Sequence, residues 1–524
     1  MSVWMSHLII APIILPAFVA AFIVLALREN LAAQRIVSFV ATSALAALGV
    51  YLFALASDGE TRPYLLGNWP VPYGIILVLD RLSALMVLLT GFLALAVVAY
   101  ASGGWDEKGK HFHALFQFQL MGIMGAFLTG DAFNLFVFFE VMLIASYGLM
   151  LHGGGPARLK AGFHYVAINL IGSTLFLFAV GLIYATTGTL NMADIARRAS
   201  EVAAGDVALL RVGALLLFLV FALKSSLAPL HWWLPTTYGA ASAPAVAIFA
   251  IMTKVGAYSI IRMNAMIFGG DAGPVAFVAE PWIIPAALVT LVVGALGVLA
   301  TRRLVDLVAF SVVWSMGSLL IALGLFDLEG LTAALYYAVH STVAAAGLFL
   351  VADMVTRRRG AAGDALRTAP PIANDALVSG LFFVAAIAMA GLPPFSGFVG
   401  KLLILDASRA SAYGPWIWTL VLVTSLLVVI GFARAGSTVF WKAQAVGGGL
   451  VAAAPPPERE FDTPRVETPA MRIAVYALLA VTALLVLFAG PVTAALEATA
   501  RQILDPAGYV AAVFDEAVIP EWSR

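Results

Sequence analysis

The chain has 524 residues, of which 62% are hydrophobic and only 11% are charged, and its formal net charge is zero. A soluble globular protein carries about 25% charged residues, so this composition argues against a large soluble enzyme. The balanced charge gives no electrostatic basis for a nucleic-acid partner, and the lack of cysteine excludes thiolate-bound zinc, cysteine-bound iron–sulfur clusters and disulfides.

Apolar runs of about 20 residues, the length that crosses a bilayer, recur along the whole chain. No Lys or Arg precedes the first run, which we therefore expect to be a retained membrane helix and not a cleaved signal peptide. No long polar domain interrupts the series. We predict an all-α polytopic membrane protein with about fourteen spans. They lie near 5–27, 35–56, 77–100, 112–129, 131–151, 163–186, 207–228, 241–262, 278–300, 303–325, 331–353, 376–408, 416–440 and 471–496.

The orientation follows from the loops, because Lys and Arg concentrate on the cytoplasmic side. With the N-terminus outside, the cytoplasmic loops hold about twice as many of these residues as the outer ones, and RRR at 357–359 contributes most. We predict a cell-membrane protein with both termini on the outer side. The segment 442–470, with GGG, PPP and mixed charges, is expected to be a cytoplasmic surface loop, and the tail 498–524 a short helix on the membrane surface.

Five ionisable residues lie inside apolar segments: Glu140, Lys224, Lys254, His340 and Lys401. Glu140 has no other charged residue within eight positions on either side. A charge at the centre of a bilayer costs roughly 2.5–3.5 kcal/mol on insertion scales, so chains rarely keep one without a use. The series therefore indicates a proton or ion path. The alternative for each residue is a structural role, as a hydrogen-bonded group in a helix interface.

Two of the spans are interrupted by proline next to a lysine, in LKSSLAPLHWWLP at 223–235 and in AGLPPFSGFVGKLL at 390–403. Proline removes a backbone donor and clashes with the preceding turn, so each helix must break or kink. Interrupted helices in corresponding positions of two halves point to a transport site between inverted repeats. His231 adjoins the first break, where it could relay protons or hydrogen-bond a freed carbonyl.

We expect several other polar residues to have structural roles. We expect Asp80 and Arg81 to pair with each other, Asp353 to lie at the membrane interface, and His113 to lie in a loop. The Trp232–Trp233 pair is expected to anchor the chain at the interface. Strand periodicity is absent, and we find no nucleophile elbow, P-loop, HExxH motif or dinucleotide fingerprint, so nothing predicts an enzyme.

The polar segments together resemble the proton-conducting antiporter family, which includes membrane-arm subunits of respiratory complex I, related hydrogenase subunits and the Mrp cation/proton antiporters. The resemblance rests on FFEVMLIASYGLM, LKSSLAPLHWWLP, MTKVGAYSIIR, AVHSTVAAAGLFLVADM and GLPPFSGFVGK. Within the family, WPVPYGIILVLDRLSALMVLL and HYVAINLIGSTLFLFAVGLIYATTGTLNMADIA favour the D-type Mrp subunits.

This resemblance implies two inverted five-helix repeats, helices 4–8 and 9–13, with helices 7 and 12 discontinuous. The domains are then helices 1–3 at 1–110, the first repeat at 111–262, the second repeat at 278–440, the cytoplasmic loop at 441–470, and helix 14 with the tail at 471–524.

The resemblance also implies proton transfer along Glu140, Lys224, Lys254, His340 and Lys401. Some complex I relatives carry glutamate at the last position, and lysine there fits the D-type Mrp subunits. The implied function is that of a proton-translocating subunit of a Na⁺ or K⁺/H⁺ antiporter, with other antiporter subunits as partners and with no cofactor or metal. The alternatives are a proton-pumping subunit of a redox complex and a membrane scaffold with structural charges.

Overall fold

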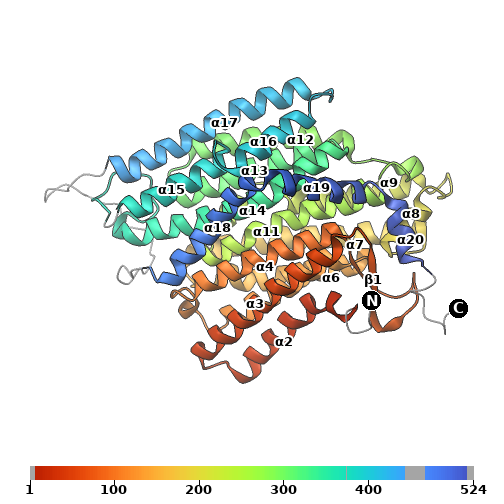
Figure 1. Ribbon diagram of the computed structural model, residues 1–524, viewed down its shortest axis with the longest axis horizontal. Helices are drawn as coiled ribbons and strands as arrows, with labels where there is room; N and C mark the ends of the chain where they lie inside the picture. The colour runs from red at the N-terminus through yellow and green to blue at the C-terminus, as the bar shows by residue number, and fades with distance from the viewer. Residues whose placement is uncertain (1–5, 373–374, 443–466, 516–524) are drawn as a thin grey trace.

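The computed structural model describes residues 6–372, 375–442 and 467–515, and it is built mainly of long helices that run in a similar direction (Figure 1). In this part of the chain, eleven helices are long and apolar enough to cross a membrane, and three apolar helices are shorter. Together they coincide with the predicted spans, which confirms a polytopic helical membrane protein.

The long helices are α3 (Leu31–Ala56), α4 (Arg81–Ala101), α6 (Ala132–Leu151), α7 (Pro156–Thr187), α9 (Val207–Lys224), α11 (Ala243–Ile260), α12 (Glu280–Ala300), α13 (Leu304–Leu323), α14 (Leu328–Arg358), α17 (Gly414–Gly436) and α18 (Pro469–Leu487). The shorter apolar helices are α2 (Ala11–Ala26), α5 (Phe112–Leu128) and α15 (Asp375–Ala390). The π-helices η4 (Ile261–Ile267) and η7 (Ser437–Trp441) extend α11 and α17.

Side-chain caps set the starts of several spans. Asn30, Asp131 and Asp327 each accept a hydrogen bond from the backbone N–H three residues further on. Asp80 forms a reciprocal capping box with Ser83 at the start of α4. These caps satisfy backbone donors that a helix start leaves free, and the carboxylates complement the helix dipole. Each polar cap thus marks where an apolar run becomes a helix.

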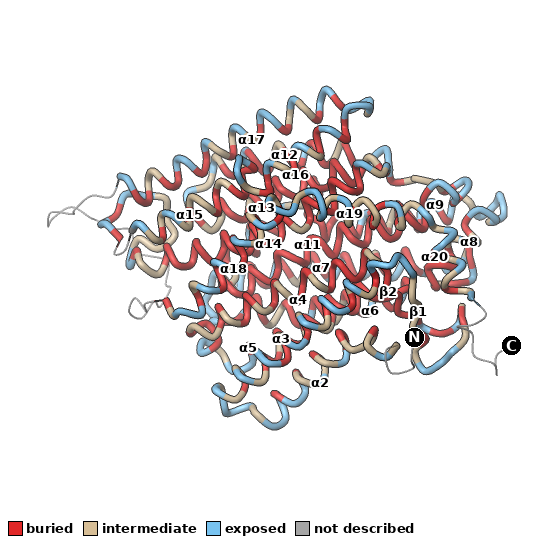
Figure 2. The backbone as a smooth tube through the Cα atoms, in the orientation of Figure 1, coloured by how far each residue is buried: buried red, intermediate tan, exposed pale blue. Residues whose placement is uncertain are grey.

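The helices at the centre differ from those at the edge in how far they are buried (Figure 2). Every residue of the most apolar part of α11 and α14 is buried, whereas only a third of it is buried in α3 and α17. The peripheral helices expose large apolar side chains such as Phe39, Leu422 and Leu426. Lipid-facing helices require such a surface, so α11 and α14 form the core around which the other spans pack.

A glycine pair recurs in the two halves at one helix–helix contact. Gly122 and Gly125 of α5 lie against Met142 and Phe138 of α6. Gly294 and Gly297 of α12 lie against Trp314 and Phe310 of α13 in the same order and with the same spacing. A Cβ atom at any of these glycines would overlap its neighbour, so only glycine lets the helices approach so closely. The recurrence supports the internal repeat, whose exact limits stay a prediction.

Both predicted helix breaks are present. α9 ends at Lys224, and the chain resumes in the short helix α10 (Trp233–Tyr238). α15 ends at Ala390, and the chain resumes in α16 (Ser396–Ala407). The peptide bonds Ala228–Pro229 and Pro393–Pro394 within the breaks are cis. Two discontinuous helices are therefore confirmed.

The predicted third span is wrong at its start. Residues 76–79 form the strand β2 (Ile76–Leu79), which pairs in antiparallel register with β1 (Arg62–Leu65), so that Arg62 lies opposite Leu79. All four residues of β2 are buried. A short, fully buried strand has no alternating pattern and cannot be distinguished from the start of an apolar helix by periodicity.

The predicted last span is wrong at its end. It ends at Leu487, and a separate helix, α19 (Ala489–Ile503), follows it. The tail contains the short helix α20 (Pro506–Val513), which packs against α8 (Met192–Ala199) and β1 and buries Tyr509. Its place on the membrane surface stays a prediction. Most of the predicted loop 441–470 and the last residues of the tail lie outside the described residues.

The first and last described elements lie at the same end of the molecule. The short helix η1 (His7–Ile9) contacts β2, and α20 contacts β1 (Figure 1). An even number of membrane crossings produces this arrangement. Which side of the membrane this end faces stays a prediction.

Candidate functional site

The helices that carry the five predicted site residues lie against one another in a row. α6 contacts α7, α7 contacts α9, α9 contacts α11, α11 contacts α14, and α14 contacts α16. The three lysines and His340 are buried, and Glu140 is half-buried. The structure therefore brings all five residues onto one continuous series of packed helices, in the order of the sequence.

Glu140 and Lys224 are held by the same helix but do not form an ion pair. Ser173 of α7 donates a hydrogen bond to Oε1 of Glu140. Nζ of Lys224 donates to Oδ1 of Asn169, also on α7, at 2.6 Å. Asn169 and Ser173 are four residues apart and so share one face of the helix. α7 thus lies between the carboxylate and the ammonium and offers each a neutral partner.

The first helix break leaves backbone N–H and C=O groups without helical partners, and side chains form hydrogen bonds with them. Trp233 Nε1 donates to the carbonyl of Leu223 at 3.0 Å, and Thr290 Oγ1 accepts from the N–H of Ala228 at 2.8 Å. Trp233 is buried, so its prediction as an interfacial anchor is wrong. His231 lies in this break, half-buried, and its Nδ1 has no hydrogen-bond partner among the described residues. These contacts hold non-helical backbone inside the protein, where it can be tolerated.

Lys254 lies in the middle of α11 and has the weakest polar surroundings of the three lysines. Its Nζ has one hydrogen bond, a long one of 3.5 Å to Oγ1 of the preceding Thr253. A small cavity of about 10 Å³ adjoins it on the side of Tyr258. The charge of Lys254 also acts on His340 of the neighbouring helix. Lys254 is therefore the least stabilised position for a positive charge in the row.

His340 of α14 is oriented by the second break. Its Nδ1 shares a hydrogen bond of 2.8 Å with Oγ of Ser396, the first residue of α16. Its Nε2 has no partner among the described residues. A Cβ atom at Gly397 would come within 2.8 Å of Nε2, so the glycine leaves space beside this nitrogen. One ring nitrogen is fixed and the other is free to exchange a proton.

Lys401 lies in the middle of the half-helix α16, and its ammonium reaches the end of the other half-helix, α15. Its Nζ donates to the carbonyl of Ala390, the last residue of α15, at 2.6 Å and to Oγ of Ser425 at 2.8 Å. It also lies 3.9 Å from the centre of the Trp314 ring. A helix C-terminus and the face of an aromatic ring both stabilise a cation. Lys401 is therefore a better site for a proton than Lys254.

Sequence reasoning missed a polar cluster around Asp353. Oδ2 of this residue accepts hydrogen bonds from Tyr100 at 2.7 Å, Trp105 at 2.9 Å and Arg357 at 2.7 Å. Asp353 is buried and lies five residues before the end of α14, and its place at the membrane interface stays a prediction. It lines a cavity of about 30 Å³ together with Arg158, Thr356 and residues at the start of α11. No local signal shows that residues 250 positions apart meet here.

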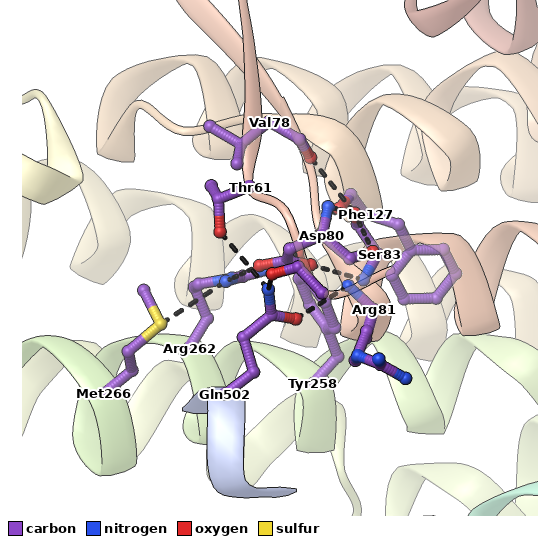
Figure 3. A network of polar contacts seen from close by, with 11 residues as sticks. Thr61, Val78, Asp80, Arg81, Ser83, Phe127, Tyr258, Arg262, Met266 and Gln502 are labelled. Carbon is purple, nitrogen blue, oxygen red and sulfur yellow. Dashed lines mark hydrogen bonds and ion pairs between the residues drawn. The ribbon is translucent and has the colours of Figure 1, made fainter. Parts of the chain in front are cut away.

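The expected pair of Asp80 and Arg81 is also wrong (Figure 3). Asp80 instead binds Arg262 through both oxygens, at 2.6 and 3.1 Å, and both side chains are buried. The backbone N–H of Arg81 donates to Gln502 of α19 at 2.9 Å. Gln502 also donates to the carbonyl of Gly59 at 2.8 Å. The C-terminal part of the chain is thereby joined to the start of the third span.

A second ion pair closes the opposite end of the N-terminal helices. Asp106, in the loop before α5, accepts hydrogen bonds from Arg35 at 2.6 and 2.8 Å and shares one with His113 at 3.0 Å. Burial raises the pKa of Asp106, but these partners lower it more, to about 2. His113 belongs to α5 and is fully buried, so its assignment to a loop is wrong.

The three lysines of the row lie apart from acidic partners and from any cluster of metal ligands. In the described part of the chain, no ion pair involves Lys224, Lys254 or Lys401, and no three His, Asp or Glu side chains converge as metal ligands. Neutral partners let a lysine gain and lose its proton, whereas a close carboxylate would hold it charged. The fold and this row define a membrane transport subunit.

Comparison with known proteins identifies the family. The model of the family described as NADH:quinone oxidoreductase/Mrp antiporter, TM matches residues 129–428. The chain is 41% identical over 474 residues to a probable D-type subunit of the K(+)/H(+) antiporter of Rhizobium meliloti (strain 1021), covering 84% of this chain and 88% of the relative. It is 35% identical over 445 residues to the D-type subunit of the Na(+)/H(+) antiporter of Bacillus subtilis (strain 168), covering 83% and 87%.

A solved structure agrees with these relatives. A chain in the structure of the Mrp complex from Dietzia sp. DQ12-45-1b superposes with a TM-score of 0.84 at 28% identity, covering 98% of this chain and all of that one. The chain belongs to the NADH:quinone oxidoreductase/Mrp antiporter family, and its resemblance to the D-type Mrp subunits is confirmed. It is a multi-pass transporter subunit and not an enzyme.

Proposed function

We propose that the chain is the proton-translocating subunit of a multisubunit Na⁺ or K⁺/H⁺ antiporter. The observation that carries the proposal is the row of buried ionisable side chains on consecutive packed helices, each with a neutral hydrogen-bond partner. Membrane proteins keep such residues for ion or proton pathways. The relatives named as D-type antiporter subunits support the choice of cation/proton exchange.

The proposed switch is the group formed by Glu140, Lys224 and α7. When the carboxylate approaches the ammonium, the charged form of Lys224 is stabilised and the lysine holds a proton. When they separate, Asn169 and Ser173 bind the two groups individually, as they do in this structure. Because both partners lie on α7, a small shift or rotation of that helix changes both hydrogen bonds together.

A proton released from Lys224 then passes to Lys254, His340 and finally Lys401, with His231 as a further relay at the first break. Lys254 has only a weak hydrogen bond, so it passes the proton on readily, whereas Lys401 holds it through three favourable contacts. A membrane potential of about 100 mV supplies about 2.3 kcal/mol per charge, which is enough to drive transfers between positions of similar energy.

The proton influx is coupled to the export of Na⁺ or K⁺ within a complex of several subunits in the cell membrane. The cation and the route it takes are not assigned to residues of this chain. The proposal places both termini on the outer side, because Arg357, Arg358 and Arg359 then face the cytoplasm.

Removal of the Glu140 carboxylate tests the proposed function. We expect Glu140→Ala in the complete complex to abolish Na⁺- or K⁺-dependent proton movement in everted vesicles, because Lys224 then has no switching partner. Glu497→Ala, at a half-exposed acidic residue of α19 that pairs with Arg501, is the control and should leave transport unchanged. Full antiport by the Glu140 variant in correctly assembled complex would refute the assignment.

The proposed orientation has its own test, which the natural lack of cysteine makes simple. Ala412→Cys lies between α16 and α17, and Lys110→Cys lies before α5, so they mark opposite ends of the molecule; both positions are exposed. We expect a membrane-impermeant maleimide to label the first variant in intact cells and the second only in everted vesicles. The reverse pattern would place both termini in the cytoplasm.

The second candidate, a proton-pumping subunit of a redox complex, is favoured by the breadth of the matching family, which includes NADH:quinone oxidoreductase subunits. The neighbouring genes distinguish the two. Genes for further small membrane subunits alone support the antiporter, whereas genes for iron–sulfur and flavin subunits support a redox complex.

A further inference from the structure

A buried network lies beyond Lys254 on the same helix, towards the end of the molecule that holds β1 and α20 (Figure 3). Arg262 is the second residue of the π-helical extension of α11 and is 2% exposed. Its guanidinium binds both oxygens of Asp80 and lies over the rings of Tyr258 and Tyr509, with 5.3 and 5.6 Å to the ring centres. π-helical segments occur frequently at functional sites.

The hydrogen bonds of this network cannot pass a proton along. The Tyr258 hydroxyl donates to the backbone carbonyl of Phe127 at 2.6 Å and accepts from Arg262 at 3.1 and 3.3 Å. A guanidinium has no acceptor and stays protonated in proteins. A backbone carbonyl likewise does not take up a proton at neutral pH. The single proton of the hydroxyl is therefore fixed between two groups that can neither receive nor replace it.

The space between Lys254 and this network is small and apolar. Lys254, Tyr258 and Arg262 follow one another at intervals of four residues, so they lie along one side of the helix. The cavity between the first two has a volume of about 10 Å³ and is otherwise lined by apolar residues, among them Leu82, Met86 and Leu319. A cavity of this volume is at the lower limit for a single water molecule, so it does not hold a chain of several waters.

We propose that the Asp80–Arg262–Tyr258 network is a proton seal. It prevents protons from passing between Lys254 and the end of the molecule that holds β1 and α20, so that the proton of Lys254 moves only along the row. The proposal rests on the proposed role of Lys254 as a proton carrier. The seal has two parts. The guanidinium of Arg262 carries a permanent positive charge that repels an approaching proton, and the hydroxyl of Tyr258 already donates its proton to the carbonyl of Phe127. Asp80 positions the guanidinium and offsets the cost of its burial.

The size of the expected effect follows from the spacing. Eight residues of helix place Arg262 roughly 12 Å from Lys254 along the axis. Two unit charges at that distance, with an effective dielectric constant of about 20, interact strongly enough to change a rate by about tenfold. Asp80 binds the guanidinium and offsets part of its charge, so removal of both charges should raise passive proton leak by less than this, at most about tenfold.

The test uses the complete antiporter complex in proteoliposomes that contain choline and neither Na⁺ nor K⁺. An acid pulse is applied, and an internal pH-sensitive dye reports the leak. The double variant Asp80→Asn with Arg262→Met removes both charges, and asparagine retains the helix cap. We expect faster leak, by at most about tenfold, and we expect the additional change Lys254→Met to restore the natural rate.

The double variant Asp80→Asn with Arg262→Lys separates a seal from a purely structural ion pair. Lysine keeps a positive charge at this position, but beside a neutral amide it can release its proton, which arginine cannot do. We expect this variant to leak faster than the single variant Asp80→Asn, which retains the guanidinium, and it also serves if the first double variant does not assemble. Arg358→Met with Glu467→Gln removes another, partly buried ion pair and should leave the leak unchanged.

Three results would overturn the proposal: natural leak rates in the assembled variant Asp80→Asn with Arg262→Met, leak that persists after Lys254→Met, or natural rates in Asp80→Asn with Arg262→Lys. The proposed function is tested separately, because Lys254→Met alone should abolish antiport. If that variant transports normally, the proton-carrier role fails, whatever the leak measurements show.

Discussion

Asn169→Leu tests how Lys224 holds its proton when Glu140 is not in contact with it. Oδ1 of Asn169 accepts the 2.6 Å hydrogen bond from Lys224, and both residues are buried. A hydrogen bond to a charged group contributes about 1.5–3 kcal/mol. Leucine has a similar size but no acceptor, so the charged form of Lys224 loses roughly this amount. Since about 1.4 kcal/mol corresponds to tenfold, we expect antiport to slow by roughly ten- to hundredfold.

The assay is cation-dependent proton movement in everted vesicles that hold equal amounts of assembled complex. Thr174→Val is the matched control. Asn169 also donates to the carbonyl of Tyr165 at 2.7 Å, and Thr174 donates in the same way to the carbonyl of Leu170 at 2.9 Å. Thr174 is exposed and lies on the same helix. The control therefore loses a similar local hydrogen bond but leaves Lys224 untouched.

Two results would refute this reasoning. Natural antiport in Asn169→Leu would mean that the ammonium needs no acceptor on α7. An equal loss in Thr174→Val would mean that the defect comes from the helix and not from Lys224. Asn169→Asp gives a further check, because a permanent carboxylate should hold Lys224 charged and slow proton release.

Three further predictions concern other parts of the molecule. Ser425→Ala removes one of the two hydrogen bonds from Lys401, and we expect antiport in the same vesicles to slow about tenfold, since charged hydrogen bonds contribute about 1.5–3 kcal/mol. The pKa of Asp106 is lowered from 3.8 to about 2, so its contribution to stability is present above about pH 4 and is lost as the pH falls towards 2. Asp106→Asn should therefore lower the unfolding free energy in detergent by about 1–2 kcal/mol at pH 7 and by much less near pH 2, and a difference that grows on acidification would contradict this. Gly294→Ala should destabilise the packing of α12 on α13 by about 1–3 kcal/mol and reduce the yield of folded protein, whereas Gly181→Ala, which meets no atom within 4 Å, should not.

The features that depend on local composition could be predicted from the sequence alone. An apolar run of about 20 residues predicts a span wherever it occurs, and proline beside Lys224 and Lys401 predicts a break because it removes a backbone donor. The five ionisable residues could be found because their neighbours are apolar. None of these inferences requires knowledge of which helices touch.

The features that were missed depend on contacts between distant parts of the chain. Arg262 ends an apolar run, and nothing near it in the sequence indicates that it binds Asp80, which is 182 positions away. Asn169 is an ordinary polar residue until α7 packs against α9 and brings it to Lys224. The strand β2 was hidden because burial of both its faces removes the alternating pattern. Burial and partner choice are properties of the packed molecule, and a single sequence does not contain them locally.

The contact of Gln502 with Arg81 has a consequence for the biosynthesis of the chain. The N–H of Arg81 is at the first position of α4, where a helix leaves its donors unsatisfied, and its partner is made more than 400 residues later. Gln502 can therefore satisfy this donor only after α19 has been synthesised and has packed against α4.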